Sequence, residues 1–226
     1  MTLAPLGAVR VFWRLSPRAR RLSLRIAPRD HALTVTVPQS CPPAQALAFV
    51  HKNTGWIVSR LQRLAQGPSF TADSLITIED KPYRILHAPT RHGGAWIEND
   101  TLVITGDAAF LSRRVMQYLR QHATRALGRD LRAMAQAAGL KPGRLDIRDP
   151  TSRWGSCSST GRIMLSWRLI LAPHPVRHYL IAHELSHLAQ MNHSPAFWKH
   201  VATLTPHRDV AENWLRHHGP LLLRAR

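Results

Sequence analysis

The chain has 226 residues, a formal charge of +18 at pH 7 and 44% apolar residues. This apolar content, without any low-complexity stretch, is typical of a folded globular protein and excludes a disordered one. The length admits one domain or two. The mildly apolar segment Met1–Val9 has no basic residue ahead of it and is followed by Arg10 and Arg14, a pattern that argues against a signal peptide or a membrane span. We therefore expect a cytoplasmic protein with no membrane partner.

Positive charge is concentrated at the N-terminal end. Residues 1–66 carry 10 basic side chains and a single acidic one, and only four of the 31 basic residues of the chain are lysine. Because the planar guanidinium of arginine suits phosphate, nucleic acid is an expected partner. A solvated basic surface explains the same charge, so both interpretations stay open.

The first part of the chain is expected to be rich in β-strands. Residues 22–26 and 33–37 alternate apolar and polar side chains around a turn at 28–31, which predicts a β-hairpin. Helical spacing from Pro43 to the stop at Gly67-Pro68 predicts one helix. Two further strand pairs are expected, Leu75–Ile78 with Tyr83–Leu86 and Ala95–Glu98 with Leu102–Ile104. These elements make up an expected N-terminal β-rich part at residues 1–106, with one helix.

Helices dominate the expected second domain, residues 107–226. A stripe of apolar residues with a period of about 3.6 predicts a long helix between Gly106 and Gly139. A short strand at Leu145–Ile147 follows, and then a hairpin that pairs residues 154–157 with 163–167. The remaining expected helices are Pro175–Met191, Pro195–Leu204 and Pro206–His217.

The motif His183-Glu184-Leu185-Ser186-His187 lies inside one of these helices. Residues four apart lie one above the other on a helix, so the imidazoles of His183 and His187 can reach a single ion. Glu184 lies on the adjoining flank, where its carboxylate can accept a proton from metal-bound water and pass it to a leaving amine. The motif predicts a hydrolase that holds one Zn²⁺ per chain, with Glu184 as general base. Tyr179, one turn earlier, orients His183, polarises the substrate or simply packs.

A catalytic zinc site needs a third protein ligand. The helix is expected to end near Asn192, which tolerates the left-handed conformation, and Ser194-Pro195 is typical of the cap and first position of a new helix. The chain can therefore reverse and present His193 to the same ion. Asp209 and Glu212 are rival ligands, because carboxylates also bind zinc. Imidazole chemistry and the turn favour His193.

The chain resembles the YgjP-like branch of the SprT-like zinc metallopeptidases. The resemblance is carried by Arg153–Ser158 (sequence RWGSCS), the strand at Ile163–Leu171, the HELSH motif and Asn192–Trp198, and it extends upstream to the Arg-rich hairpin and the helix with Trp56-Ile57. It implies an α+β, zincin-like fold with a mixed sheet packed against the HExxH helix. It also implies His183, His187 and His193 as ligands and Glu184 as base. The metzincins share the spacing of the third histidine, but Gln190 stands where they need glycine.

The resemblance also implies a peptide or protein substrate. In zincins a strand runs along the cleft above the metal, and its backbone can pair with an extended peptide. Trp154, Gly155 and Ser156 would border this cleft, although Trp154 and Cys157 fit a packing role equally well. Related SprT-like proteases cleave proteins attached to DNA, which agrees with the basic charge.

Two other functions stay open. An Arg-rich cleft could hold a nucleoside triphosphate and the metal could activate water against phosphorus, although the sequence contains no P-loop. The other alternative is a non-enzymatic nucleic-acid-binding protein with structural zinc. The oligomeric state is not predicted.

Overall fold

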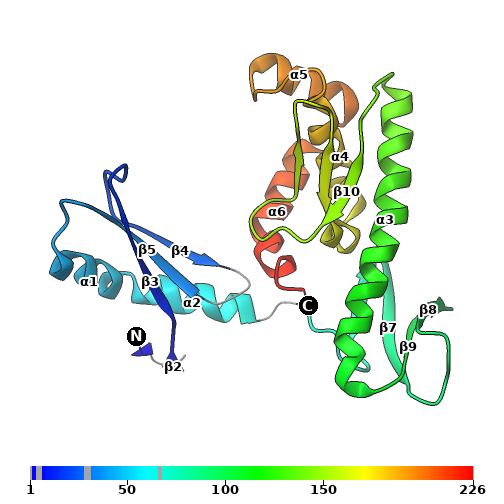
Figure 1. The fold of residues 1–226 in the computed structure, drawn as a ribbon, viewed down its shortest axis with the longest axis horizontal. Coiled ribbons are helices and arrows are strands. Elements are labelled where there is room, and N and C mark those ends of the chain that lie inside the picture. Colours follow the sequence, from blue (N-terminus) through cyan, green and yellow to red (C-terminus); the bar gives the residue numbers. More distant parts are fainter. Residues whose placement is uncertain (1, 4–6, 28–31, 66–67, 226) are drawn as a thin grey trace. The chain divides into compact units, whose positions relative to one another are not determined.

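The computed structural model describes residues 2–3, 7–27, 32–65 and 68–225 and contains two compact units, Met1–Gly67 and Pro68–Arg226 (Figure 1). The N-terminal unit contains β1 (Thr2–Leu3), β2 (Gly7–Ala8), β3 (Val11–Ser16), β4 (Ser23–Ala27), β5 (Ala32–Pro38), α1 (Pro43–Lys52) and α2 (Thr54–Ala65). The C-terminal unit contains β6 (Leu75–Ile78), β7 (Lys81–Ala88), β8 (Ala95–Glu98), β9 (Thr101–Thr105), η1 (Ala108–Phe110), α3 (Leu111–Ala137), β10 (Leu145–Arg148), β11 (Gly155–Cys157), β12 (Ile163–Ser166), η2 (Trp167–Leu171), α4 (His174–Ser186), α5 (Pro195–Leu204) and α6 (Arg208–Leu222).

The N-terminal unit is a three-stranded sheet with helices on one face. β4 pairs with β5 in antiparallel fashion, which confirms the predicted hairpin, although its turn at 28–31 lies outside the described residues. β3 was not predicted and joins the other edge of β5 in parallel. Alternate residues of β5, Leu33 and Val35, are fully buried in a core with Val50 and Ile57 of the two helices. None of the described helices of this unit packs on the opposite face of the sheet.

The single helix expected after Pro43 is wrong, because two helices stand there. Asn53 ends α1: its side-chain Nδ2 donates to the carbonyl of Phe49 at 2.7 Å, and its backbone N–H reaches the carbonyls of Phe49 and Val50. An Asn side chain competes in this way with the regular helix ladder, and α2 starts anew at Thr54.

In the C-terminal unit, the sheet β6-β7-β9-β8 shares one core with the long helix α3. Both predicted strand pairs are confirmed as antiparallel hairpins, and β7 and β9 add a parallel pairing between them. Buried Ile85, Leu102 and Ile104 cluster with Val115 and Leu119 of α3. Residues 68–106 thus belong with the helices that follow, and the division falls after Gly67, not after residue 106. Local periodicity cannot reveal it, because the apolar stripe of α3 does not say which element covers it.

A second mixed sheet, in the order β10-β12-β11, accompanies α3 and α4. β12 pairs in parallel with β10 and in antiparallel fashion with β11, so β11 is an edge strand. β11 lies beside α4, and the buried turn η2 packs on α3. This arrangement confirms the expected α+β, zincin-like fold. None of the helices that the structure describes combines the length and apolar character needed to cross a bilayer.

The last helix is longer than predicted. α5 spans Pro195–Leu204 as expected, but α6 begins at Arg208 and continues beyond His217 to Leu222. Leu222 and the following Leu223 are buried, so their packing extends the helix through Pro220.

Candidate metal centre

α4 carries the HELSH motif in its last turn. The helix ends at Ser186, five residues before the predicted Met191, and His187 takes the cap position. A tight turn follows, in which the N–H of Leu188 donates to the carbonyl of Leu185. The carbonyl of Gln190 lies 3.1 Å from His187 Nδ1 and can accept its proton, which leaves Nε2 as the free ligand atom. Because the helix ends at Ser186, the carbonyl of Gln190 can approach His187 and fix the orientation of its imidazole ring.

His193 is presented by the connection between α4 and α5. The predicted left-handed Asn192 is wrong, because Asn192 is not among the described residues with positive φ. The predicted cap is confirmed: the Ser194 hydroxyl accepts a hydrogen bond from the Phe197 N–H at 3.4 Å, and Pro195 opens the helix. Ser194 itself is extended, with φ −69° and ψ 170°, so an extended residue leads the chain from the histidine into the next helix.

The three imidazoles converge. One nitrogen from each of His183, His187 and His193 lies within 4.8 Å of the others, and the Nε2 atoms of His183 and His193 are 3.1 Å apart. A tetrahedral zinc ion with Zn–N bonds near 2.0 Å would hold its ligand nitrogens about 3.3 Å apart. The donor set and its spacing therefore fit zinc. The rival ligands Asp209 and Glu212 are not in this group, among the residues that the structure describes.

The ring of Phe197 packs against all three histidines, a role that the sequence did not predict. Its fully buried ring lies 5.0, 4.6 and 4.8 Å from the ring centroids of His183, His187 and His193, respectively. Helical spacing puts Phe197 and Val201 on one buried face of α5, which the sequence could have revealed. It could not reveal that this face meets the histidines.

Burial sets the protonation of the site. Desolvation, together with the neighbouring imidazoles of His187 and His193, lowers the pKa of His183 to about 4, and burial also lowers that of His187. Both rings are therefore neutral at pH 7, as metal ligation requires. Glu184 is 4% exposed, and burial raises its pKa to about 8 although Arg153 acts in the opposite direction. Its Oε2 atom has no hydrogen-bond partner among the described residues, so no side chain there competes for the carboxyl proton.

Gly155 of the edge strand β11 lies against the Glu184 carboxyl group. A Cβ at this position would stand 2.4 Å from Oε1 and 2.7 Å from Cγ of Glu184, so only glycine leaves room for this carboxyl group. The neighbouring Trp154 does not face Glu184 in this way but packs closely against Gly219 of α6, where a Cβ would lie 3.2 Å from the Trp154 ring. The contact between Gly155 and Glu184 joins residues far apart in the sequence, so it could not be foreseen.

With Glu184 as the expected general base, we expect Gly155→Ala to lower kcat/KM for peptide hydrolysis by about 10- to 100-fold, because displacing such a group by about 1 Å is enough for a loss of this size. The added methyl group would push the Glu184 carboxyl group from its position. Gly55→Ala, where a Cβ meets nothing within 4 Å, is the matched control and should leave activity unchanged. Equal activity of both variants in a peptide cleavage assay would contradict the expectation.

Tyr179 and Glu212 form a hydrogen-bonded pair beside the histidines. The Tyr179 hydroxyl donates to Glu212 Oε1 at 2.7 Å, and Arg208 Nε donates to the same atom at 3.0 Å. Partial burial opposes ionisation of Glu212, but these hydrogen bonds outweigh it and lower its pKa. The Tyr179 ring also stands edge-on to His183, with centroids 5.9 Å apart. Glu212 is thus an ionised group that fixes Tyr179.

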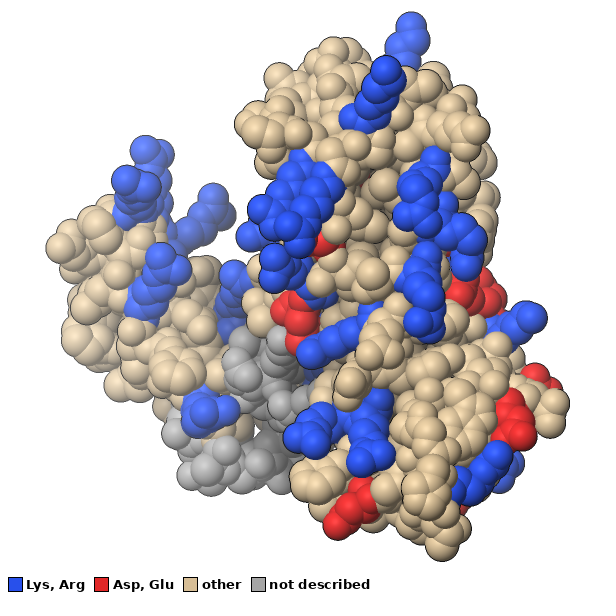
Figure 2. Space-filling model, turned by 45° about the vertical axis from the view of Figure 1, so that its right-hand side comes forward, with Lys and Arg blue, Asp and Glu red and all other residues tan. Residues whose placement is uncertain are grey.

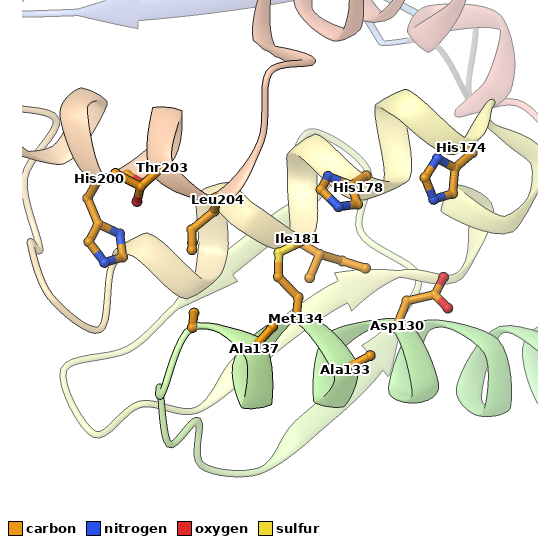
Figure 3. Close-up of a pocket in the computed structure, with 11 residues that line it drawn as sticks. Asp130, Ala133, Met134, Ala137, His174, His178, Ile181, His200, Thr203 and Leu204 are labelled. Carbon is orange, nitrogen blue, oxygen red and sulfur yellow. The ribbon is translucent and has the colours of Figure 1, made fainter.

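A pocket of about 430 Å³ opens in front of Glu184. It is lined by Trp154, Gly155, Tyr179, Leu180, His183, Glu184, Glu212, Leu215 and Arg216. A pocket of about 540 Å³ elsewhere, between α3, α4 and α5, is larger but does not contact the three converging histidines (Figure 3). The chemistry of the lining, and not the volume, therefore identifies the first pocket as the candidate substrate site.

A mixed sheet beside a helix with two histidines four residues apart, and a third histidine in the connection that follows, define the zincin-like class of metallopeptidases. The chain belongs to the YgjP-like family within this class: the sequence model of the YgjP-like metallopeptidase domain matches residues 20–218. The match spans both units. No curated protein and no solved structure matches the chain.

Proposed function

We propose that the protein is a zinc-dependent metallopeptidase in which His183, His187 and His193 hold one Zn²⁺ and Glu184 is the general base. The observation that carries the proposal is the convergence of three imidazole nitrogens within 4.8 Å next to a buried carboxyl group. The metallopeptidase family of the chain supports the same reaction.

Each side chain then has a chemical task. A bound zinc ion would lower the pKa of a water molecule and polarise the scissile carbonyl. Glu184 takes the proton from this water on its unpartnered Oε2 and delivers it to the leaving amine. Tyr179 lines the pocket, lies edge-on to the ring of His183 and is held by its hydrogen bond to Glu212, so it would help to position His183.

We further propose that the substrate lies along β11 as an added strand. Among the strands that the structure describes, β11 pairs with β12 alone, so its other edge has backbone groups to offer an extended peptide. The register with β12 turns the main-chain N–H and C=O of Ser156 toward that strand and those of Gly155 and Cys157 toward the other edge, so Gly155 and Cys157 would make these backbone contacts. The packing of Trp154 against Gly219 supports a structural role for that ring.

The pocket favours a peptide over a nucleoside triphosphate. Glu184 and Glu212 both line it, and Arg216 is the one Lys or Arg among the described lining residues. The ionised Glu212 disfavours a polyphosphate, which would need several cationic groups to offset its charge. This observation weighs against the nucleotide alternative.

Nucleic-acid contact is the part of the proposal that concerns the N-terminal unit. The helix-free face of its sheet bears two cross-strand rows, Phe12-Thr34-Arg25 and Arg14-Thr36-Ser23. Phe12 is 55% exposed, and Figure 2 shows Lys and Arg without acidic side chains on the visible face of this unit. An exposed aromatic ring beside arginines suits stacked bases and phosphates. A peptidase with this face would reach proteins associated with nucleic acid.

We expect His187→Ala to weaken zinc binding by roughly 100-fold or more, since one of three protein ligands is lost. Equilibrium dialysis against a chromophoric zinc chelator measures the change. His217→Ala, which removes an exposed imidazole on α6, is the control and should bind zinc as the wild type does. Unchanged affinity in His187→Ala would remove His187 from the site.

A direct assay separates the candidate functions. The zinc-loaded protein is given an unfolded protein substrate, the same substrate coupled to single-stranded DNA, and a panel of nucleoside triphosphates. Peptide cleavage that stops on addition of a chelator is the expected result. Phosphate release without peptide cleavage would overturn the proposal, and stimulation by DNA that Arg14→Glu/Arg25→Glu abolishes would support the nucleic-acid part.

A further inference from the structure

A second group of histidines lies on α4, away from the first. His174 and His178 are four residues apart, and both precede the HELSH motif. His183 follows His174 by nine residues, so at about 100° per residue the two pairs point to opposite sides of the helix. α4 therefore carries two pairs of histidines with four-residue spacing, and the proposed metallopeptidase site uses only one of them.

His207, at the start of α6, completes this second cluster. Ring centroids are 5.5 Å apart for His174 and His178, 5.5 Å for His178 and His207, and 6.5 Å for His174 and His207. These spacings exceed the 4.9 to 5.1 Å of the first trio. His174 is exposed, so its ring can turn inward by a change of rotamer without displacing the core.

The surroundings of His178 are those of a metal ligand. Its Nδ1 atom lies 2.9 Å from the hydroxyl oxygen of the buried Thr205, which can accept a hydrogen bond from the Nδ1–H group. The lone pair of Nε2 is then available to a metal. Metal-binding histidines are oriented by such a second partner. Partial burial, with His174 and His207 nearby, lowers the pKa of His178, so the ring is neutral at pH 7.

Acidic groups around the cluster suit a cation. Figure 3 shows Asp130 of α3 at the same end of the 540 Å³ pocket as His174 and His178, and its charge acts on His178. The carboxylate of Asp80 accepts the His174 N–H, with both oxygens at 3.1 Å, and offsets the positive end of α4. Arg177, the nearest cation on the helix, is itself bound to Asp80.

We propose that His174, His178 and His207 form a second site for a divalent transition metal such as Zn²⁺ or Ni²⁺, with Asp130 or water as the remaining ligand. Imidazole is the preferred ligand of these ions. The site is separate from the proposed peptidase centre and does not depend on it.

The test counts metal ions bound to the full chain after saturation with Ni²⁺ and removal of free ions by gel filtration. We expect about two ions per wild-type chain, and about one in His174→Ala/His178→Ala and in His187→Ala. His200→Ala is the matched control, because His200 lines the same pocket at the end opposite His174 and bonds with Ser186 (Figure 3). It should bind about two ions. Two ions in His174→Ala/His178→Ala, or none in His187→Ala, would overturn the proposal.

A second measurement needs no substitution that could disturb folding. Paramagnetic Ni²⁺ titrated into the wild-type protein should broaden the ring-proton NMR signals of His174 and His178 together with those of the first trio. Broadening confined to His183, His187 and His193 would overturn the second site and leave the peptidase proposal intact. Broadening confined to His174, His178 and His207 would do the reverse.

Discussion

Glu184→Gln is expected to lower peptide hydrolysis by about 10³-fold, within the range that a positioned general base contributes. The amide keeps the shape of the side chain against Gly155 but cannot take a proton at Oε2. The zinc content should not change, because the converging ligand atoms belong to the three histidines. Steady-state cleavage of a fluorogenic peptide, with metal analysis of the same sample, measures both quantities.

Glu98→Gln is the control for this substitution. Glu98 lies on β8, outside the site, and forms an ion pair of 3.0 Å with Arg91. This variant should retain wild-type turnover. A Glu184→Gln protein that still cleaves peptide at the wild-type rate would exclude Glu184 as the base. If the wild type cleaves no peptide and Glu184→Gln binds nucleic acid as the wild type does, the structural-zinc alternative is favoured instead.

The second large effect concerns the stability of the metal-free protein. An unfolded glutamate titrates near 4.5 and Glu184 in the folded chain near 8, because of burial. Between these values the folded state holds a proton that the unfolded state has lost, so the free energy of unfolding falls as the pH rises from about 5 to 8. Glu184→Gln removes this loss. Its stability relative to the wild type should grow with pH by about 1.4 kcal/mol per unit, up to about 4 kcal/mol.

Urea unfolding in the presence of a chelator, repeated at several pH values, measures this difference. The buried amide adds a constant cost at every pH, so the slope with pH and not the offset is the test. Glu98→Gln should show no gain between pH 5 and 8, because the hydrogen bond and charge of Arg91 lower the pKa of Glu98 and keep it ionised throughout. A pH-independent difference for Glu184→Gln would contradict the raised pKa.

The parts of the site that lie close together in the sequence were predictable. Four-residue spacing placed His183 and His187 on one face, and the Ser194-Pro195 signal identified the start of α5 that delivers His193. These inferences succeed because helix periodicity and caps are local properties of the chain.

The parts that depend on long-range contacts were not predictable. Gly155 meets Glu184, and Phe197 meets His183, across distances in the chain that no local pattern encodes. The boundary after Gly67 escaped for the same reason, because the sheet of β6 to β9 resembles the preceding hairpin locally but packs on α3.

The shortness of β11 limits how firmly the proposed cleft can hold a polypeptide. Of the three residues of β11, only Gly155 and Cys157 turn their main-chain groups to the free edge, so the strand can offer at most four hydrogen bonds to a guest chain, each worth about 1 kcal/mol. A millimolar complex already requires about 4 kcal/mol. Substrate selection would therefore depend on binding at another surface of the protein. Cleavage would then occur in any unstructured segment of the bound target that reaches the metal.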